Sequence, residues 1–117
     1  MTGQAGDAAS ARDQYAQLLP EFAQVLGPEH PETLSTRARL AYWTGQAGDA
    51  ASARDQYAEL LAIRERLLGP EHPQTLNTRA NLARTTGEAG DAASARNQYA
   101  ELLAIRERLL GPEHPRQ

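Results

Sequence analysis

The stretch "TGQAGDAASARDQYAELLAIRERLLGPEHP", residues 44–73, contains most of the information that determines the fold. It returns at residues 86–115 with only two changes, and residues 2–43 carry a more divergent copy of the same unit. The period is therefore 42 residues. A fixed period of this size indicates a helical repeat array, in which each unit buries its apolar face against its neighbours.

Each repeat predicts two helices joined by short turns. In the second repeat the longer helix, called helix B, follows the N-cap residue Asp49 and stops at Gly69. Apolar residues recur along it at steps of three and four, which gives one broad apolar stripe. The shorter helix A starts at Pro73, where a missing N–H is no loss, and ends at Gly90. We expect antiparallel neighbours in the order B-A-B-A-B, over residues 7–26, 32–46, 49–68, 74–88 and 91–110.

The composition fits one all-α domain over residues 1–117, made of units 2–43, 44–85 and the incomplete unit 86–117. Apolar residues make up 40% of the chain and aromatic residues only 5%, which suits close helix packing. Alanine, leucine, glutamate and arginine dominate the sequence. All four are strong helix formers, so strands are not expected.

The same composition excludes several functional classes. The chain has no cysteine, so it has no disulfide, thiolate metal site or thiol nucleophile. Its formal net charge of −3 does not provide the basic footprint of a nucleic-acid binder. No apolar run reaches the length of a membrane helix. We expect a cytoplasmic protein with no catalytic residue, no cofactor, no metal, and no nucleic-acid or membrane partner.

The glycine-rich stretch at residues 44–52 looks at first like a phosphate-binding loop. Such a loop needs a preceding strand and a lysine, whereas the sequence predicts no strand and contains no lysine. A joint between two helices explains it better. Gly48 can close helix A in a left-handed conformation, and Asp49 can cap the free N–H groups of helix B. Gly45 removes a side chain where the two helices converge.

These residues resemble the tetratricopeptide repeat. The Gly-Asp turn of that family falls at Gly48 and Asp49, and its Ala-x-x-x-aromatic spacing falls at Ala53 and Tyr57, although Arg79 stands where tryptophan is usual. The 42-residue period and the ending "LGPEHP" are similar to the repeats of kinesin light chains and of related bacterial arrays. The resemblance implies a right-handed α-solenoid of antiparallel helix pairs, with helix A on the concave face, that binds a peptide or protein partner.

The histidines of the three "GPEHP" segments are His30, His72 and His114, each beside a glutamate. A histidine next to a carboxylate can bind zinc or move protons. However, these histidines lie one repeat apart in a row, whereas a zinc site needs ligands that converge. We expect each histidine to cap helix A or to pack at the exit of helix B.

Other polar residues of helix B have structural interpretations. The aromatic position is expected in the core, with the hydroxyl at an edge, and holds Tyr15, Tyr57 and Tyr99. The serine of the first turn is expected to bond to free backbone N–H groups, and is Ser10, Ser52 or Ser94. A solvated outer face with local ion pairs is expected at Arg64, Glu65 and Arg66.

Three of the six differences between the two helices A fall on one face of the helix. Serine becomes asparagine, arginine becomes asparagine and tyrosine becomes arginine at positions that share this face. Partner recognition produces such a pattern, and so does drift at exposed positions. We call it the groove face; its residues are Ser35, Ala38, Arg39, Tyr42, Asn77, Ala80, Asn81 and Arg84.

The chemistry of the groove face suggests a ligand class. Arg39 and Arg84 favour an acidic peptide, and Tyr42 offers a surface on which a bulky apolar residue can stack. By resemblance, Asn81 occupies the position where related repeats hold the backbone of a ligand with an amide. The neighbouring Trp43 is expected to pack between helices rather than to bind ligand.

The first helix B differs from the other two. Pro20 lies inside it, where proline removes a backbone hydrogen bond and clashes with the preceding turn. The apolar residue also moves, from the Ile63 position to Phe22 one position later. We expect a kink at Pro20 that lets Phe22 cover what Ile63 covers in the second repeat.

The chain begins at a joint, so its first and last helices B each lack one neighbouring helix A. This looks like a piece of a longer array. Exposed apolar stripes favour self-association. As an alternative to peptide binding, we therefore expect a structural segment that dimerises or stacks end to end through its terminal helices.

Overall fold

The computed structural model describes residues 4–111. It contains five α-helices: α1 (Gln4–Leu26), α2 (Pro31–Gln46), α3 (Ala50–Leu68), α4 (Pro73–Glu88) and α5 (Ala92–Leu110). The predicted all-α class and the order B-A-B-A-B are confirmed, with α2 and α4 as helices A. The predicted ends agree within one residue, except that α1 begins earlier, at Gln4. None of these helices is both long and apolar enough to cross a membrane.

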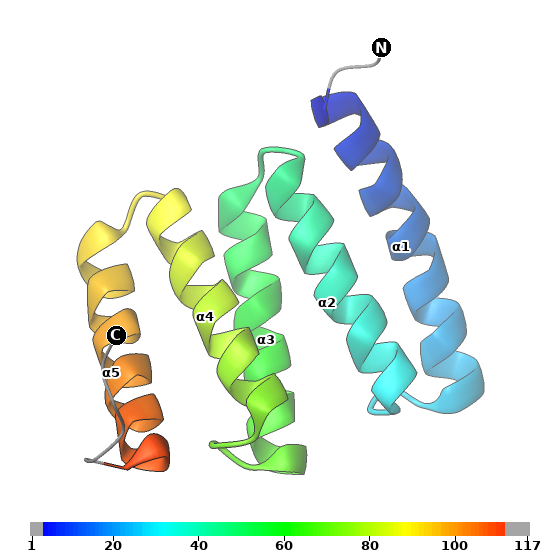
Figure 1. Cartoon of the computed structure of the whole chain (residues 1–117). Coiled ribbons are helices and arrows are strands. Elements are labelled where there is room, and N and C mark those ends of the chain that lie inside the picture. Colours follow the sequence, from blue (N-terminus) through cyan, green and yellow to red (C-terminus); the bar gives the residue numbers. More distant parts are fainter. Residues whose placement is uncertain (1–3, 112–117) are drawn as a thin grey trace.

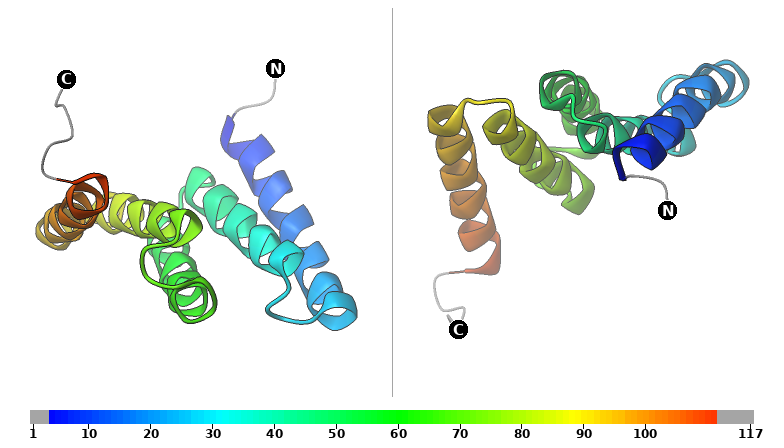
Figure 2. Two further views of the ribbon diagram at one scale, coloured as in Figure 1. Left: turned by 60° about the horizontal axis from the view of Figure 1, so that its bottom comes forward. Right: turned by 90° about the horizontal axis from the view of Figure 1, so that it is seen from above.

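The helices follow one another across the molecule in chain order. Figure 1 shows them running alternately up and down, from α1 at one end to α5 at the other. Extensive contacts join α1 to α2, α2 to α3, α3 to α4, and α4 to α5. The two views of Figure 2 show that the row is curved rather than flat. The described chain is therefore a helical solenoid, in which each helix packs mainly on its sequence neighbours.

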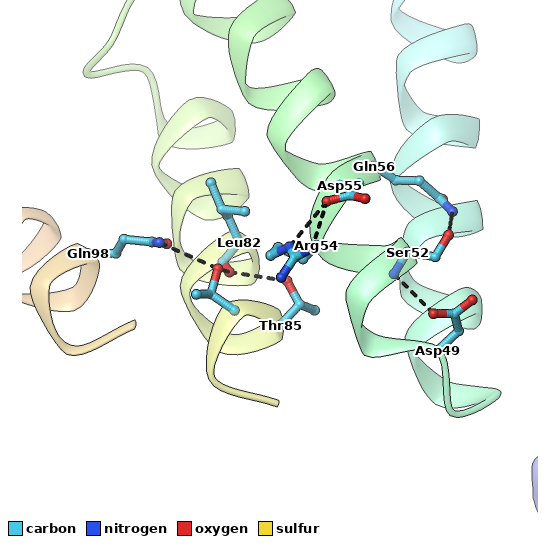
Figure 3. A network of polar contacts seen from close by, with 9 residues as sticks. Asp49, Ser52, Arg54, Asp55, Gln56, Leu82, Thr85 and Gln98 are labelled. Atoms are coloured by element: carbon cyan, nitrogen blue, oxygen red, sulfur yellow. Dashed lines mark hydrogen bonds and ion pairs between the residues drawn. The ribbon is translucent and has the colours of Figure 1, made fainter. Parts of the chain in front are cut away.

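The glycine-rich stretch is a helix joint, as predicted. Gly48 has a φ of 103°, which favours glycine, and it follows the end of α2. The Asp49 carboxylate accepts a hydrogen bond from the Ser52 backbone N–H at 3.1 Å and caps α3 (Figure 3). At Gly45, a Cβ atom would lie 3.4 Å from the Cβ of Ala53, so glycine lets the two helices approach closely.

The first-turn serines of α3 and α5, Ser52 and Ser94, act differently from the prediction. The Ser52 backbone N–H is already bonded to Asp49, and the Ser52 hydroxyl accepts from the Gln56 side-chain amide at 3.2 Å (Figure 3). The same amide also donates to the Thr44 hydroxyl at 3.3 Å. The serine therefore helps to orient a glutamine that ties α3 to α2.

Threonines form most of the buried polar surface. In both helices A they share the inner face with leucine and alanine, and they are Thr33, Thr36, Thr44, Thr75, Thr78, Thr85 and Thr86. Most of their hydroxyls donate to the carbonyl four residues earlier, as Thr36 does to Glu32 at 2.9 Å. These hydroxyls are thus satisfied without a partner from another helix.

The tyrosine position is in the core only where helices cover it from both sides. Tyr57 is 2% exposed in α3, so the prediction is confirmed there. Tyr15 is half-buried in α1. Tyr99 is 45% exposed, so the prediction is wrong for α5. The reason is that α5 packs extensively on α4 alone.

The expected outer face at Arg64, Glu65 and Arg66 is wrong for Arg64, which is only 7% exposed. Its Nη1 donates to the Thr78 hydroxyl at 3.0 Å, and its Nε has no hydrogen-bond partner. Burial lowers the pKa of the Arg64 guanidinium. Arg64 is therefore a buried cation at the interface of α3 with α4, and it makes no ion pair with the described residues.

The ion pairs of the other two residues connect separate elements rather than neighbours in one helix. Glu65 accepts from Arg79 of α4 at 3.0 Å, and Arg79 also lies 3.8 Å from Glu101 of α5. Arg66 pairs with Glu29 in the turn between α1 and α2. The prediction of local pairs is therefore wrong for both, because Glu65 pairs with the next helix of its own repeat and Arg66 pairs with a turn of the preceding repeat.

A kink at Pro20 was expected to bring Phe22 into the position that Ile63 has in the second repeat. The structure does not need such a kink to explain the position of Phe22. α1 continues as one helix through Pro20, and Figure 1 draws it as one unbroken ribbon. With the 42-residue period, Phe22 corresponds to Arg64, and Glu21 corresponds to Ile63. Phe22 is partly buried and Glu21 is exposed, so the register is unchanged. Phe22 replaces the buried Arg64, and the prediction that it replaces Ile63 is wrong.

Replacing Asp49 tests the joint. We expect Asp49→Ala to lower the free energy of unfolding by about 1 kcal/mol, because the first turn of α3 loses its capping carboxylate. Asp49→Asn keeps an accepting oxygen and should lose little. Urea unfolding followed by circular dichroism measures both. The control is Asp55→Ala, at an exposed aspartate paired with the adjacent Arg54; an equal loss there contradicts the capping role.

Replacing Arg64 tests the cost of the buried cation. We expect Arg64→Met to raise the free energy of unfolding by about 1 kcal/mol, because an unpaired buried charge is exchanged for an apolar chain of similar length. The Thr78 hydroxyl stays satisfied, since it donates to the Gln74 carbonyl at 2.8 Å. The control is Arg106→Met in α5, where the matching arginine is exposed. Loss of stability in Arg64→Met alone contradicts this prediction.

Candidate partner-binding face

The groove face lies on the sides of α2 and α4 that the neighbouring helices leave accessible. None of its eight residues is fully buried, whereas the other sides of both helices carry the buried threonines and leucines. Arg39, Tyr42 and Asn77 are exposed, and the remaining five are partly buried: Ser35, Ala38, Ala80, Asn81 and Arg84. The helices thus hold these residues outward on rigid elements.

A polar cluster forms on the α4 part of this face. Arg84 donates from Nη1 to the Asn81 side-chain oxygen at 3.0 Å, and its Nε lies 3.6 Å from the Glu88 carboxylate. Because its oxygen accepts from Arg84, Asn81 keeps its amide N–H groups as donors. Glu88 partly neutralises Arg84. The cationic character of the face therefore comes mainly from Arg39, which makes no ion pair with the described residues.

An aromatic pair forms on the α2 part. The rings of Tyr42 and Trp43 meet edge to face, with centroids 4.9 Å apart and an angle of 80° between their planes. Tyr42 is 40% exposed, while Trp43 is partly buried beside it. Trp43 therefore supports the exposed ring of Tyr42 and is placed to sense changes there.

Tyr57 of α3 is a residue of this site that the sequence interpretation assigned only to the core. Burial raises the pKa of the Tyr57 hydroxyl, and nearby Arg84 opposes that rise. Tyr42 and Glu88 also raise the pKa of this hydroxyl. Tyr57 is almost fully buried, so it belongs to the core beneath the face, and its hydroxyl is within electrostatic range of residues of α2 and α4. From the sequence, the only indication of this role was the expectation that the tyrosine hydroxyl reaches an edge of the core.

The histidines of the "GPEHP" turns cap helices A, as predicted. His30 Nδ1 accepts from the Glu32 backbone N–H at 3.0 Å, and His72 Nδ1 accepts from that of Gln74 at 3.1 Å. His114 lies outside the described residues. The adjacent glutamates bind arginines of the next helix B, since Glu29 pairs with Arg66. The second copy of this pair joins Glu71 to Arg108.

These features define a class of protein: a helical repeat solenoid with a variable polar and aromatic face on alternate helices. The family model for the tetratricopeptide repeat matches residues 2–66 and residues 39–108. The chain belongs to the tetratricopeptide repeat family. Repeats of this family generally mediate protein–protein interactions, and their fold is typically a non-catalytic scaffold.

Solved structures agree with this assignment. The chain is similar to a crystal structure of "Podosopora anserina putative kinesin light chain nearly identical TPR-like repeats", with 28% identity and a TM-score of 0.81 over 96% of this chain and 53% of that one. A point-substitution variant of the same protein matches with 26% identity and a TM-score of 0.78, over 89% of this chain and 49% of the other. The chain thus spans about half the length of these structures. No curated protein matches it.

The pair of Glu29 and Arg66 predicts a dependence of stability on pH. The hydrogen bond from Arg66 holds the pKa of Glu29 below its ordinary value. A carboxyl with a lowered pKa in the folded state stabilises the fold above its unfolded pKa, and this contribution is lost as the pH falls through the folded pKa. We expect Glu29→Gln to lower the melting temperature slightly at neutral pH, with the difference from the wild type lost as the pH falls through the lowered pKa of Glu29.

Glu32→Gln is the control for this measurement, because Glu32 is exposed and makes no ion pair with the described residues. Its melting temperature should follow the wild type across the same range. A difference between Glu29→Gln and the wild type that stays constant down to acid pH contradicts the role assigned to the pair.

Proposed function

We propose that the groove face binds an extended peptide segment of a partner protein. The observation that carries the proposal is the division between the two sides of helices A. Most buried threonines and leucines repeat from α2 to α4; the exception is Thr85, which stands where α2 has Trp43. The changes from Ser35 to Asn77 and from Arg39 to Asn81 fall on the accessible side. A largely constant scaffold beneath a changing surface is suited to recognition.

The side chains of this face favour an acidic peptide with one bulky apolar residue. Arg39 is exposed and free to meet a carboxylate, which arginine can bind through two parallel hydrogen bonds. The exposed ring of Tyr42, supported by Trp43, offers a flat apolar surface. These two groups lie on α2, so we assign the charged and apolar contacts of the ligand chiefly to that helix.

On α4 the groups suit the peptide backbone instead. Asn81, with its oxygen held by Arg84, presents amide N–H donors that can meet a backbone carbonyl. Asn77 lies one turn earlier and is exposed. Backbone contacts carry little sequence preference, so we assign specificity to α2 and general affinity to α4. A cytoplasmic location belongs to this proposal.

A second candidate function is self-association through α1 and α5. It is favoured by the apolar residues that these two helices expose, including Val25 on α1 and Leu103 on α5. Contiguous exposed apolar surface of this kind commonly marks an interaction site. The two functions use different faces, so each can be tested separately.

The test of peptide binding uses a short synthetic peptide with glutamates on both sides of a central leucine. Trp43 is the single tryptophan, so its fluorescence reports binding next to Tyr42. We expect Arg39→Ala combined with Arg84→Ala to raise the Kd at least about tenfold, because charge-assisted hydrogen bonds are lost. The dependence of Kd on salt should weaken as well.

The matched control variant is Arg54→Ala with Arg96→Ala, which removes the same charge from helices B. The matched control peptide has glutamine in place of glutamate. Binding that is equally strong with the glutamine peptide, or equally weakened in both double variants, contradicts the proposal. Unchanged binding and salt dependence in the Arg39 and Arg84 double variant contradicts it as well.

A further inference from the structure

The two terminal helices expose some apolar residues whose counterparts in the inner helix α3 are buried. Leu18 is 40% exposed and Tyr99 is 45% exposed, whereas the matching Leu60 and Tyr57 are 0% and 2% exposed. α1 packs extensively on α2 alone and α5 on α4 alone, whereas each inner helix packs on two neighbours. On α1, the exposed side includes Val25, which is 79% exposed, and it forms a shallow apolar depression. We call this surface the α1 end face; its residues are Leu18, Glu21, Phe22, Val25 and Leu26.

The second surface lies on α5, and the matching residues in α3 form a buried helix-packing surface. We call it the α5 end face; its residues are Tyr99, Leu102, Leu103 and Arg106. In α3 the matching residues include Tyr57 and Leu60, which are buried between α2 and α4. Leu103, by contrast, is 57% exposed. The α5 end face therefore has the composition of a helix-packing surface without a second helix on it.

The two end faces carry opposite charges. Glu21 is the one charged residue of the α1 end face, and Arg106 is the one charged residue of the α5 end face. Both are exposed, and neither makes an ion pair with the described residues. Glu21 stands where α3 has Ile63, so the acid is particular to α1.

An arginine at this position is compatible with a helix interface. Arg64, the counterpart of Arg106 in α3, is covered by α4 and donates to a threonine there. A carboxylate is a stronger partner for a guanidinium than a threonine hydroxyl is. Glu21 on another copy can supply this carboxylate within an otherwise apolar contact.

We propose that the α1 end face of one copy packs against the α5 end face of a second copy, with Glu21 opposite Arg106. This proposal rests on the second candidate function and gives it an orientation. A two-fold contact through either face brings two like charges onto one apolar interface, which opposes binding. The head-to-tail contact pairs unlike charges and leaves one free face at each end, so further copies can add.

Two blocked variants test the orientation. Val25→Asp places a charge on the α1 end face and Leu103→Asp places one on the α5 end face, both at exposed positions. Circular dichroism checks that each variant keeps the helical fold. We expect the wild-type chain to grow in average mass with concentration in analytical ultracentrifugation. Each variant alone should be a monomer, since it keeps only one usable face. An equimolar mixture should form a one-to-one dimer and nothing larger.

Other outcomes overturn the proposal in distinguishable ways. If the wild-type chain stays monomeric at all concentrations, the proposal of self-association is wrong. If Val25→Asp dimerises alone, the contact is two-fold through α5, and if Leu103→Asp does so, it is two-fold through α1. A mixture that stays monomeric while the wild type associates shows that other surfaces are used. Ala58→Asp, at an exposed position of α3, is the control and should associate like the wild type.

A charge exchange tests the pair itself. Glu21→Arg and Arg106→Glu should each weaken association at least about tenfold, because like charges then meet in the interface. The double variant Glu21→Arg/Arg106→Glu restores opposite charges and should recover association. Circular dichroism confirms that each variant folds. Failure of the double variant to recover association contradicts the assigned pair, and peptide binding to any of these variants reports on the groove face independently.

Discussion

The close approach of helix A to helix B at Gly45 and Ala53, repeated at Gly87 and Ala95, sets the geometry on which the other packing depends. A Cβ atom at Gly87 would lie 3.3 Å from that of Ala95, which leaves no room for a larger side chain without a shift. With the backbones this close, small residues suffice to fill the interface. This explains how a chain with so few aromatic residues can form a continuous core.

Ionic contacts between repeats form a second level of organisation. Arg79 reaches glutamates of both α3 and α5, and therefore connects three helices. The pairs of Glu29 with Arg66 and of Glu71 with Arg108 connect each turn to the following helix B. Individually such exposed pairs contribute little. However, equivalent pairs recur in successive repeats, so each turn is joined to the following helix B at the same position.

The sequence predicted the helices, the joint and the histidine caps because these depend on local chemistry. Gly48, Asp49 and His72 act on backbone groups within a few residues of themselves. The burial of Arg64 could not be predicted in this way, because it depends on α4 lying over that part of α3. A charged residue beside others in "IRERLL" has the pattern of a solvent face, and only the packing distinguishes Arg64 from Arg66.

In the candidate site, too, the features set by local sequence could be predicted, whereas those set by packing between helices could not. The periodicity of helix A placed its eight residues on one accessible side, and the i, i+4 spacing of Arg84 and Glu88 made their ion pair predictable as well. It could not show that Tyr57 contributes its hydroxyl from α3, because that depends on contacts between helices. The different exposures of Tyr57 and Tyr99, in nearly identical sequence, make the same point, because burial depends on the number of neighbouring helices.

The threonines on the inner sides of α2 and α4 have a mechanical consequence. Because Thr36, Thr78 and Thr86 donate to carbonyls of their own helices, those hydrogen bonds survive when one helix slides slightly against another. Thr33 instead donates to the Gly27 carbonyl just after α1, and Thr75 donates to the Arg64 carbonyl in α3, close to the start of each helix A. The threonine hydroxyls bonded within their own helix therefore keep a hydrogen-bond acceptor when neighbouring helices shift slightly, although the bonds that Arg64 donates to Thr78 and Gln56 donates to Thr44 would lengthen. Such a core tolerates small changes in the curvature of the array without leaving those buried hydroxyls unsatisfied.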